Sequence, residues 1–146
     1  MYAMSEVIVV TTSDELETKM VGKKLAETLK GGEFIELIGD LGAGKTAFVK
    51  GLALGLGSTD SVSSPSFALK NVYDGKFLLQ HFDLYRLEDP GIMLNEIKEA
   101  AEQPDAITVV EWGGIVDDSM PSQRYKITFS TKSENERELK LEFPKL

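Results

Sequence analysis

The residues best suited to chemistry in this chain lie in one segment, 39–46, which reads Gly-Asp-Leu-Gly-Ala-Gly-Lys-Thr. The segment fits the phosphate-loop pattern G-x-x-x-x-G-K-[ST] at every fixed position. Glycines allow successive backbone N–H groups to point at one centre, and a helix that begins there adds the positive end of its dipole. The segment therefore predicts a site for the phosphates of a nucleotide.

Two side chains of this segment have distinct predicted tasks. Lys45 would lie against the β and γ phosphates of ATP, and Thr46 would offer its hydroxyl to Mg²⁺. Mg²⁺ requires near-octahedral oxygen coordination and takes its other ligands from phosphates, water and a carboxylate. The residues expected to contact the nucleotide here are Gly39, Asp40, Leu41, Gly42, Ala43, Gly44, Lys45, Thr46 and Ala47.

Two acidic residues end apolar runs that are typical of neighbouring strands. Glu111 follows residues 107–110 and is the candidate metal carboxylate, whereas Asp83 would orient the attacking water or sense the γ phosphate. With Lys45 they form the predicted catalytic set. His81 is the single histidine, which is more typical of a hydrogen-bonded structural residue than of a base. Trp112, the single tryptophan, would lie beside the nucleotide or fill the core, and both interpretations stay open.

The elements that must position these residues follow from turn signals and apolar periodicity. Thr12 and Glu15 have the spacing of a capping box, and Gly31-Gly32 would end the helix that it begins. Helices are also expected at 45–56 and 90–101. The apolar face of the first helix is predicted to consist of Leu16, Met20, Val21, Leu25 and Leu29.

The remaining apolar runs predict a sheet. Asp74-Gly75 favours a tight hairpin between two of its strands, so part of the sheet should be antiparallel. We expect a three-layer α/β sandwich of the P-loop NTPase type with a mixed, partly antiparallel sheet, formed as one domain by residues 1–146. Strands are predicted at 7–11, 34–38, 67–73, 77–83, 106–110, 125–130 and 138–143.

Composition limits the possible partners and location. The chain has 146 residues and a formal net charge of −8, so its averaged field repels nucleic acid and any role on tRNA must be shared with a partner. Cysteine is absent, which excludes thiolate metal sites and a cysteine nucleophile. No apolar run approaches the roughly 18 residues of a membrane span, so a cytoplasmic protein without membrane contact is expected.

Missing motifs narrow the base and the reaction. Neither the Asn-Lys-x-Asp nor the Asp-x-x-Gly segment of guanine-specific GTPases occurs, which favours adenine. Residues 87–123 contain no arginine and one lysine, whereas a small-molecule kinase usually needs a basic lid. The chain has three arginines, Arg86, Arg124 and Arg137, so slow hydrolysis that waits for a partner is expected. A small-molecule kinase and a nucleotide-dependent binding switch with negligible catalysis remain the alternatives.

Four segments together carry a specific resemblance. They are residues 39–46, Ser64-Pro65-Ser66-Phe67, residues 81–86 (His-Phe-Asp-Leu-Tyr-Arg) and Glu111-Trp112. In this order and spacing they resemble the TsaE (YjeE) family, the bacterial ATPase required to make N6-threonylcarbamoyladenosine (t6A) at position 37 of tRNA. The resemblance extends from about Ser13 to Arg137.

The resemblance implies roles for particular residues. Thr46 and Glu111 would serve Mg²⁺, Asp83 would support hydrolysis, and Trp112 would lie near the nucleotide. Ser64–Phe67 would behave as a mobile switch. The residues that would flank the adenine are Glu15, Glu136 and Arg137. The implied partners are the TsaD and TsaB proteins, of which TsaD carries the transfer chemistry, and tRNA would be met only through that complex.

The chain departs from the family pattern at three places. Ala47 stands where a second threonine is common, and Ser66 stands where threonine is usual. Asn95-Glu96-Ile97 occupies a position where the family often has a Leu-Gly turn. The last departure weakens the expectation that this helix docks on the partners.

Overall fold

The computed structural model describes residues 6–40, 42–60, 62, 70–85 and 87–144. In this part of the chain, seven strands form one sheet in the order β1-β7-β6-β2-β5-β4-β3. The strands are β1 (Val7–Thr12), β2 (Phe34–Ile38), β3 (Lys70–Tyr73), β4 (Leu78–Asp83), β5 (Ala106–Glu111), β6 (Tyr125–Thr131) and β7 (Arg137–Glu142). The helices are α1 (Glu15–Thr28), α2 (Lys45–Gly55), α3 (Met93–Ala101) and the short 3-10 helix η1 (Gly113–Ser119).

The sheet is parallel in its middle and antiparallel at its margins. Strand β2 pairs in parallel with β5 and β6, and β4 pairs in parallel with β5. Strands β3, β7 and β1 each run antiparallel to the neighbour through which they join the sheet. This arrangement confirms the predicted mixed sheet, and it places the ends of β2, β4 and β5 at the same edge.

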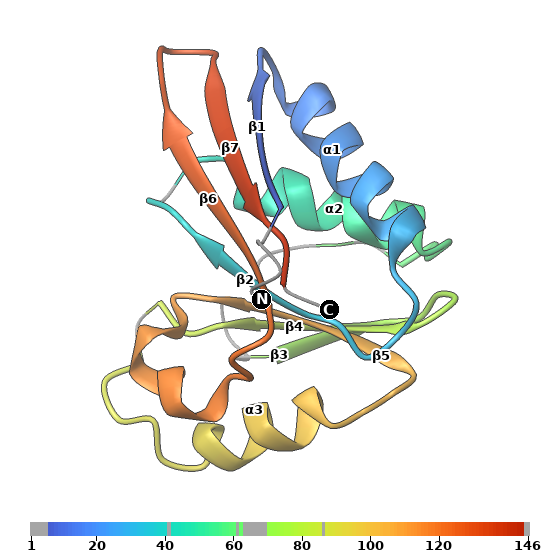
Figure 1. Cartoon of the computed structure of the whole chain (residues 1–146), viewed down its shortest axis with the longest axis vertical. Coiled ribbons are helices and arrows are strands. Elements are labelled where there is room, and N and C mark those ends of the chain that lie inside the picture. Colours follow the sequence, from blue (N-terminus) through green and yellow to red (C-terminus); the bar gives the residue numbers. More distant parts are fainter. Residues whose placement is uncertain (1–5, 41, 61, 63–69, 86, 145–146) are drawn as a thin grey trace, which may run out of the picture.

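Helices cover both faces of the sheet (Figure 1), with α1 and α2 on one side and α3 and η1 on the other. Alternation along β5 divides the core accordingly, because Ile107 and Val109 pack with the α1–α2 side whereas Val110 packs with the α3 side. The predicted three-layer sandwich is confirmed. No helix in the described part of the chain is long and apolar enough to cross a membrane.

The start of α1 differs from the predicted capping box at Thr12 and Glu15. Asp14 is the N-cap, since its Oδ1 accepts a hydrogen bond from the Glu17 backbone N–H at 2.8 Å. The Glu17 side chain in turn accepts from the Ser13 backbone N–H at 2.7 Å. Thr12 belongs to β1, and its buried hydroxyl lies 2.7 Å from the Thr18 hydroxyl. The prediction was wrong by two residues because Thr12 is needed inside the sheet.

The buried face of α1 was predicted correctly at its C-terminal end, where Leu25 and Leu29 are buried and Val21 packs against the core. The prediction was wrong for Leu16, which is 64% exposed, and for Met20, which is 37% exposed. The residues that α1 buries, together with its C-cap, are Thr18, Gly22, Leu25, Ala26 and Leu29.

The cause is a very close approach of α1 to α2 through glycines. A Cβ atom on Gly51 would lie 1.8 Å from the Lys19 carbonyl oxygen, and one on Gly22 would lie 2.3 Å from the Phe48 carbonyl oxygen. The helices therefore meet backbone to backbone, and large apolar side chains are turned away from the line of contact.

The hairpin of β3 and β4 is antiparallel as expected, but its connection is not a two-residue turn. Tyr73 pairs with Leu79, so several residues bridge the strands. A Cβ on Gly75 would lie 2.7 Å from the Leu56 carbonyl oxygen, which accepts a hydrogen bond from the Lys76 backbone N–H at 2.6 Å. Glycine at this position allows the connection to pack on the end of α2. Residues 67–69 of the predicted strand lie outside the described residues.

The close contact between α1 and α2 can be tested with a substitution for which helix propensity and packing predict opposite changes in the free energy of unfolding. Alanine in place of a helical glycine gains up to about 1 kcal/mol in an isolated helix. Gly51→Ala should instead lower the free energy of unfolding by about 1–3 kcal/mol, because the methyl group overlaps the Lys19 carbonyl. Urea denaturation measures the change. Gly114→Ala is the control, since nothing lies within 4 Å of its added Cβ. A Gly51→Ala protein as stable as the wild type would contradict the close contact.

Candidate functional site

The phosphate loop connects β2 to α2. Gly42 (φ 77°) and Gly44 (φ 106°) adopt left-handed conformations, which glycine takes without strain. Gly44 is the N-cap of α2, and no side chain caps that helix end in the described structure. Because the first N–H groups of a helix lack partners within the helix, this end of α2 is suited to an anion.

Lys45 is the cation at the start of α2. Its Nζ donates a hydrogen bond to the Gly39 carbonyl oxygen at 2.6 Å, lies 3.9 Å from Glu111 Oε1 and sits 4.1 Å from the centre of the Trp112 ring. The side chain is only 5% exposed. Burial lowers the pKa of the Lys45 ammonium, although the nearby carboxylates of Glu111, Asp83 and Asp40 act in the opposite direction. A negatively charged ligand would stabilise the ammonium further.

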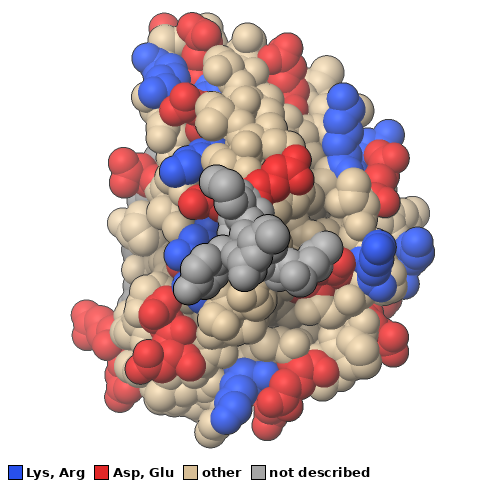
Figure 2. Space-filling view, in the orientation of Figure 1, with Lys and Arg blue, Asp and Glu red and all other residues tan. Residues whose placement is uncertain are grey.

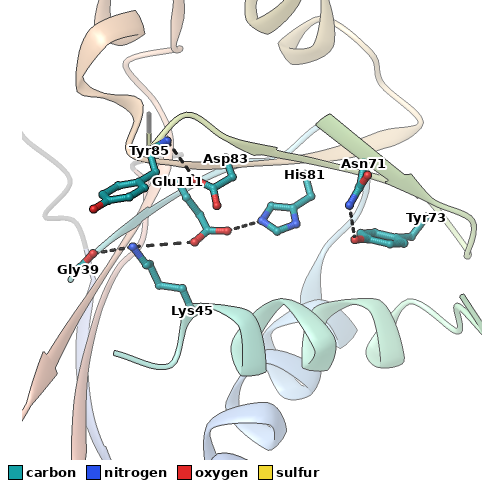
Figure 3. Close-up of polar contacts among 8 residues, drawn as sticks. All are labelled: Gly39, Lys45, Asn71, Tyr73, His81, Asp83, Tyr85 and Glu111. Carbon is teal, nitrogen blue, oxygen red and sulfur yellow. Dashed lines mark hydrogen bonds and ion pairs between the residues drawn. The ribbon is translucent and has the colours of Figure 1, made fainter. Parts of the chain in front are cut away.

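The two predicted carboxylates are neighbours at the ends of β4 and β5. Asp83 lies opposite Glu111 in the parallel register, and Figure 3 shows both side chains on the side of the sheet where α2 begins. Glu111 is 4% exposed, whereas Asp83 is half-buried and accepts a hydrogen bond from the Tyr85 backbone N–H at 3.1 Å. The pair brings hard carboxylate oxygens close to Lys45.

His81 lies two residues before Asp83, on the same face of β4 and deeper in the protein. It is fully buried, and its Nε2 forms a short hydrogen bond with Glu111 Oε2. The histidine therefore contacts the site through Glu111, in agreement with its interpretation as a hydrogen-bonded residue.

Trp112 has an unusual backbone. With φ 58° it is the one non-glycine residue of the described chain in the left-handed region. Its ring packs against Tyr85, with 4.9 Å between the ring centres, and lies under the Lys45 ammonium. Trp112 also packs against the core on the α3 side, which agrees with its interpretation as a core residue. A position beside the nucleotide stays a prediction.

These groups line one pocket of about 620 Å³, a volume in the range of small-ligand sites. The predicted site residues that line it are Glu15, Gly42, Gly44, Lys45, Thr46, Ala47, Asp83, Glu111, Trp112 and Arg137. Within the pocket, the N-terminus of α2 thus lies together with Lys45, the Thr46 hydroxyl and the adjacent carboxylates of Asp83 and Glu111.

Other predicted residues take different places. Ala43 is buried and packs in the core, while Gly39 and Asp40 line a separate hollow of about 370 Å³ beside Trp112. Leu41, Ser64–Phe67 and Arg86 lie outside the described residues. Contacts of Gly39, Asp40, Leu41 and Ala43 with a nucleotide stay predictions.

Sequence reasoning missed four residues of the pocket, which are Asp14, Thr18, Glu134 and Asn135. Asp14 and Thr18 come from the start of α1, whose position over the phosphate loop depends on the glycine contact with α2. Glu134 and Asn135 belong to the turn between β6 and β7, which has the composition of an ordinary polar hairpin loop.

Arg137 holds that turn against the phosphate loop. Its guanidinium donates to the carbonyl oxygens of Ser133, Glu134 and Glu136 at 3.1–3.3 Å, and to that of Gly42 at 3.4 Å. The predicted Glu136-Arg137 pair was the available signal for this wall of the pocket, and the arginine is its organising member.

The donor set fits Mg²⁺ bound together with phosphates. No group of three or more acidic or histidine side chains in the described chain is placed to hold a metal ion alone. A cation at Thr46 and Glu111 would need phosphate and water oxygens to complete its coordination, which is how Mg²⁺ is commonly bound beside nucleotides.

The sequence profile of the family described as "Threonylcarbamoyl adenosine biosynthesis protein TsaE" matches residues 12–139. The chain belongs to the TsaE family. It is 40% identical over 124 residues to the TsaE protein of Bacillus subtilis strain 168, covering 84% of this chain and 77% of the relative. It is 35% identical to the Treponema pallidum TsaE protein, covering 84% and 91% of the two chains.

A solved structure gives the same result for the fold of this TsaE-family chain. The crystal structure of Bacillus subtilis YdiB superimposes with a TM-score of 0.81 and 32% sequence identity, covering 99% of this chain and 90% of that one. The resemblance inferred from the four segments is thereby confirmed, as is the P-loop NTPase fold class.

The buried lysine generates a prediction about pH. Because burial lowers the pKa of Lys45 below the ordinary value of 10.5, the unfolded chain binds more protons than the folded one between the two pKa values. The free energy of unfolding of the wild type should therefore gain from this group as pH rises through that window. Lys45→Met removes the group, so its stability relative to the wild type should decrease as the pH rises toward the ordinary lysine pKa of 10.5.

Urea denaturation across that pH range measures the difference. Lys50→Met, which removes an exposed lysine of the same helix, serves as the control for losing one positive charge. A relative stability of Lys45→Met that stays constant or increases with pH would contradict the lowered pKa.

Proposed function

We propose that this TsaE-family protein binds MgATP, hydrolyses it slowly when alone, and couples this cycle to the TsaD–TsaB complex that makes t6A at position 37 of tRNA. The observation that carries the proposal is the single pocket in which the start of α2, Lys45, Thr46, Asp83 and Glu111 meet. Residues 1–146 would act as one ATPase domain.

The binding step is assigned to the phosphate loop. Backbone N–H groups at the start of α2 would donate hydrogen bonds to phosphate oxygens, and Lys45 would exchange its present contact with the Gly39 carbonyl for the β and γ phosphates. Burial favours this exchange because an anion compensates the buried ammonium better than a neutral carbonyl does.

The metal is assigned to Thr46 and Glu111. Mg²⁺ would neutralise charge that develops on the transferring phosphoryl group. Thr46 lines the pocket as the second residue of α2, and Glu111 lines it as the last residue of β5. These two side chains therefore enter one pocket from different elements.

Asp83 is assigned to the water. Its carboxylate is half-buried, lies beside Glu111 and lines the pocket, so it can accept a hydrogen bond from a water molecule next to the phosphates. The adenine of ATP would lie toward Glu15 and toward the turn between β6 and β7 that Arg137 holds.

Slow hydrolysis without partners is supported by the arginines. Arg124 is bound to Glu36 and Asp117 at 3.0 Å each, and to the Pro121 carbonyl. Arg137 is bound to the carbonyl oxygens of its own turn. Both of these guanidinium groups already have partners, whereas Arg86 lies outside the described residues. A charge supplied by a partner is a known way to accelerate such sites.

Indirect contact with tRNA is supported by the charge distribution. The net charge is −8, and on the face shown in Figure 2 acidic and basic side chains are interspersed without a continuous basic surface. The partners would therefore have to hold the tRNA.

ATP labelled at the γ phosphate, with and without purified TsaD and TsaB, tests the proposal. Label released as inorganic phosphate, at a rate that the partners increase, is the expected result. Label transferred to a small acceptor would establish a kinase instead. Binding without turnover under every condition would establish a nucleotide-dependent switch.

Binding and turnover should separate in two variants. Lys45→Ala should lower MgATP affinity by about tenfold or more, because charge-assisted contacts worth about 1.5–3 kcal/mol are lost. Asp83→Asn should keep ATP affinity within a few-fold, yet lower partner-stimulated hydrolysis by about 10²–10⁴-fold. Calorimetry and phosphate release measure the two quantities. Full hydrolytic activity of Asp83→Asn would remove Asp83 from the catalytic set.

A further inference from the structure

The single histidine of the chain is built into the sheet beside a candidate metal ligand. His81 lies opposite Val109 in the parallel register of β4 and β5, and Glu111 follows two residues later on the same face. Both side chains point toward the start of α2 (Figure 3), and His81 is completely buried. Their contact therefore follows from strand register and does not depend on a loop.

The two oxygens of Glu111 have different surroundings. Oε2 accepts the hydrogen bond of His81 Nε2, whereas Oε1 lies 3.9 Å from Lys45 Nζ. Since a carboxylate only accepts hydrogen bonds, Nε2 must carry the hydrogen.

The other ring nitrogen supports the same tautomer. His81 Nδ1 is buried and has no hydrogen-bond partner among the described residues. A lone pair without a donor is more easily tolerated at such a position than an N–H group without an acceptor. The imidazole is therefore set to donate to Glu111 and to nothing else in the described structure.

We propose that His81 is the positioning residue of Glu111. By occupying Oε2, it turns Oε1 toward Lys45 and the pocket, where the proposed function needs a metal-binding oxygen. His81 itself does not line the pocket, so it acts through Glu111 and is not a catalytic residue. Partners that orient a ligating side chain commonly change metal affinity or activity by about 10–100-fold, and this proposal rests on the proposed role of Glu111.

The preceding residue of the same strand provides a matched control. Gln80 is also buried, and its amide donates to Thr108 Oγ1 of β5 at 3.2 Å and to the Ala100 carbonyl at 3.3 Å. These contacts lie on the α3 side of the sheet. Gln80→Leu therefore removes a buried polar contact between β4 and β5 without touching Glu111.

His81→Leu is compared with Gln80→Leu in calorimetric binding of adenylyl imidodiphosphate, with Mg²⁺ and with EDTA. In EDTA, the affinity of His81→Leu for the analogue should lie within about twofold of the wild-type affinity. The factor by which Mg²⁺ raises that affinity should be about tenfold smaller than in the wild type. Partner-stimulated ATP hydrolysis by His81→Leu should require a correspondingly higher Mg²⁺ concentration for half-saturation. Gln80→Leu should match the wild type in both measurements.

A second pair of variants keeps the test valid if His81→Leu does not fold. Glutamine places its amide nitrogen near the position of Nε2, whereas asparagine is too short to reach Glu111. His81→Gln should retain most of the Mg²⁺-dependent gain, and His81→Asn should lose it.

Two outcomes would overturn the positioning role. One is a wild-type Mg²⁺ response in folded His81→Leu or His81→Asn, and the other is an equal loss in Gln80→Leu. If the wild-type protein itself showed no Mg²⁺-dependent binding of the analogue, the proposed function would fail, and the role of His81 would fail with it.

Discussion

Lys45 places an ammonium group in a position that is almost closed to water, and a buried charge requires acceptor oxygens around it. The Gly39 carbonyl supplies one, and Glu111 supplies opposite charge at 3.9 Å. Glu111 is itself buried and is held from its other side by His81. The site is thus a chain of mutually dependent polar contacts that runs from α2 through β5 to β4.

That chain of contacts exists because of the strand order. β2, β5 and β4 are parallel neighbours, so the phosphate loop, Glu111 and Asp83 emerge at one edge of the sheet. Ligand sites in parallel α/β sheets generally lie at this carboxyl edge. The antiparallel additions serve a different purpose, since the turn between β6 and β7 reaches over the same edge and Arg137 fastens it to Gly42.

The side of the pocket that α1 forms depends on backbone contact between helices. Glycines let α1 approach α2 so closely that the N-terminus of α1, with Asp14 and Thr18, borders the phosphate loop. A pair of helices separated by large side chains would sit about 8–10 Å apart and would leave that side open. Packing and pocket shape therefore share one cause in this protein.

The sequence by itself determined the phosphate loop, the mixed α/β sandwich and the family, because these depend on local patterns: spaced glycines before a helix, apolar runs of strand length, and four short segments in a fixed order. It also singled out most residues of the pocket, since strand ends before polar residues are visible in a sequence. Only the tertiary structure decided the contact between His81 and Glu111, the α1 face and cap, the role of Gly75, and the entry of Glu134 and Asn135 into the pocket. Each of these depends on the register between strands or on the approach between helices that are distant in the sequence. No local sequence pattern encodes the register or the approach.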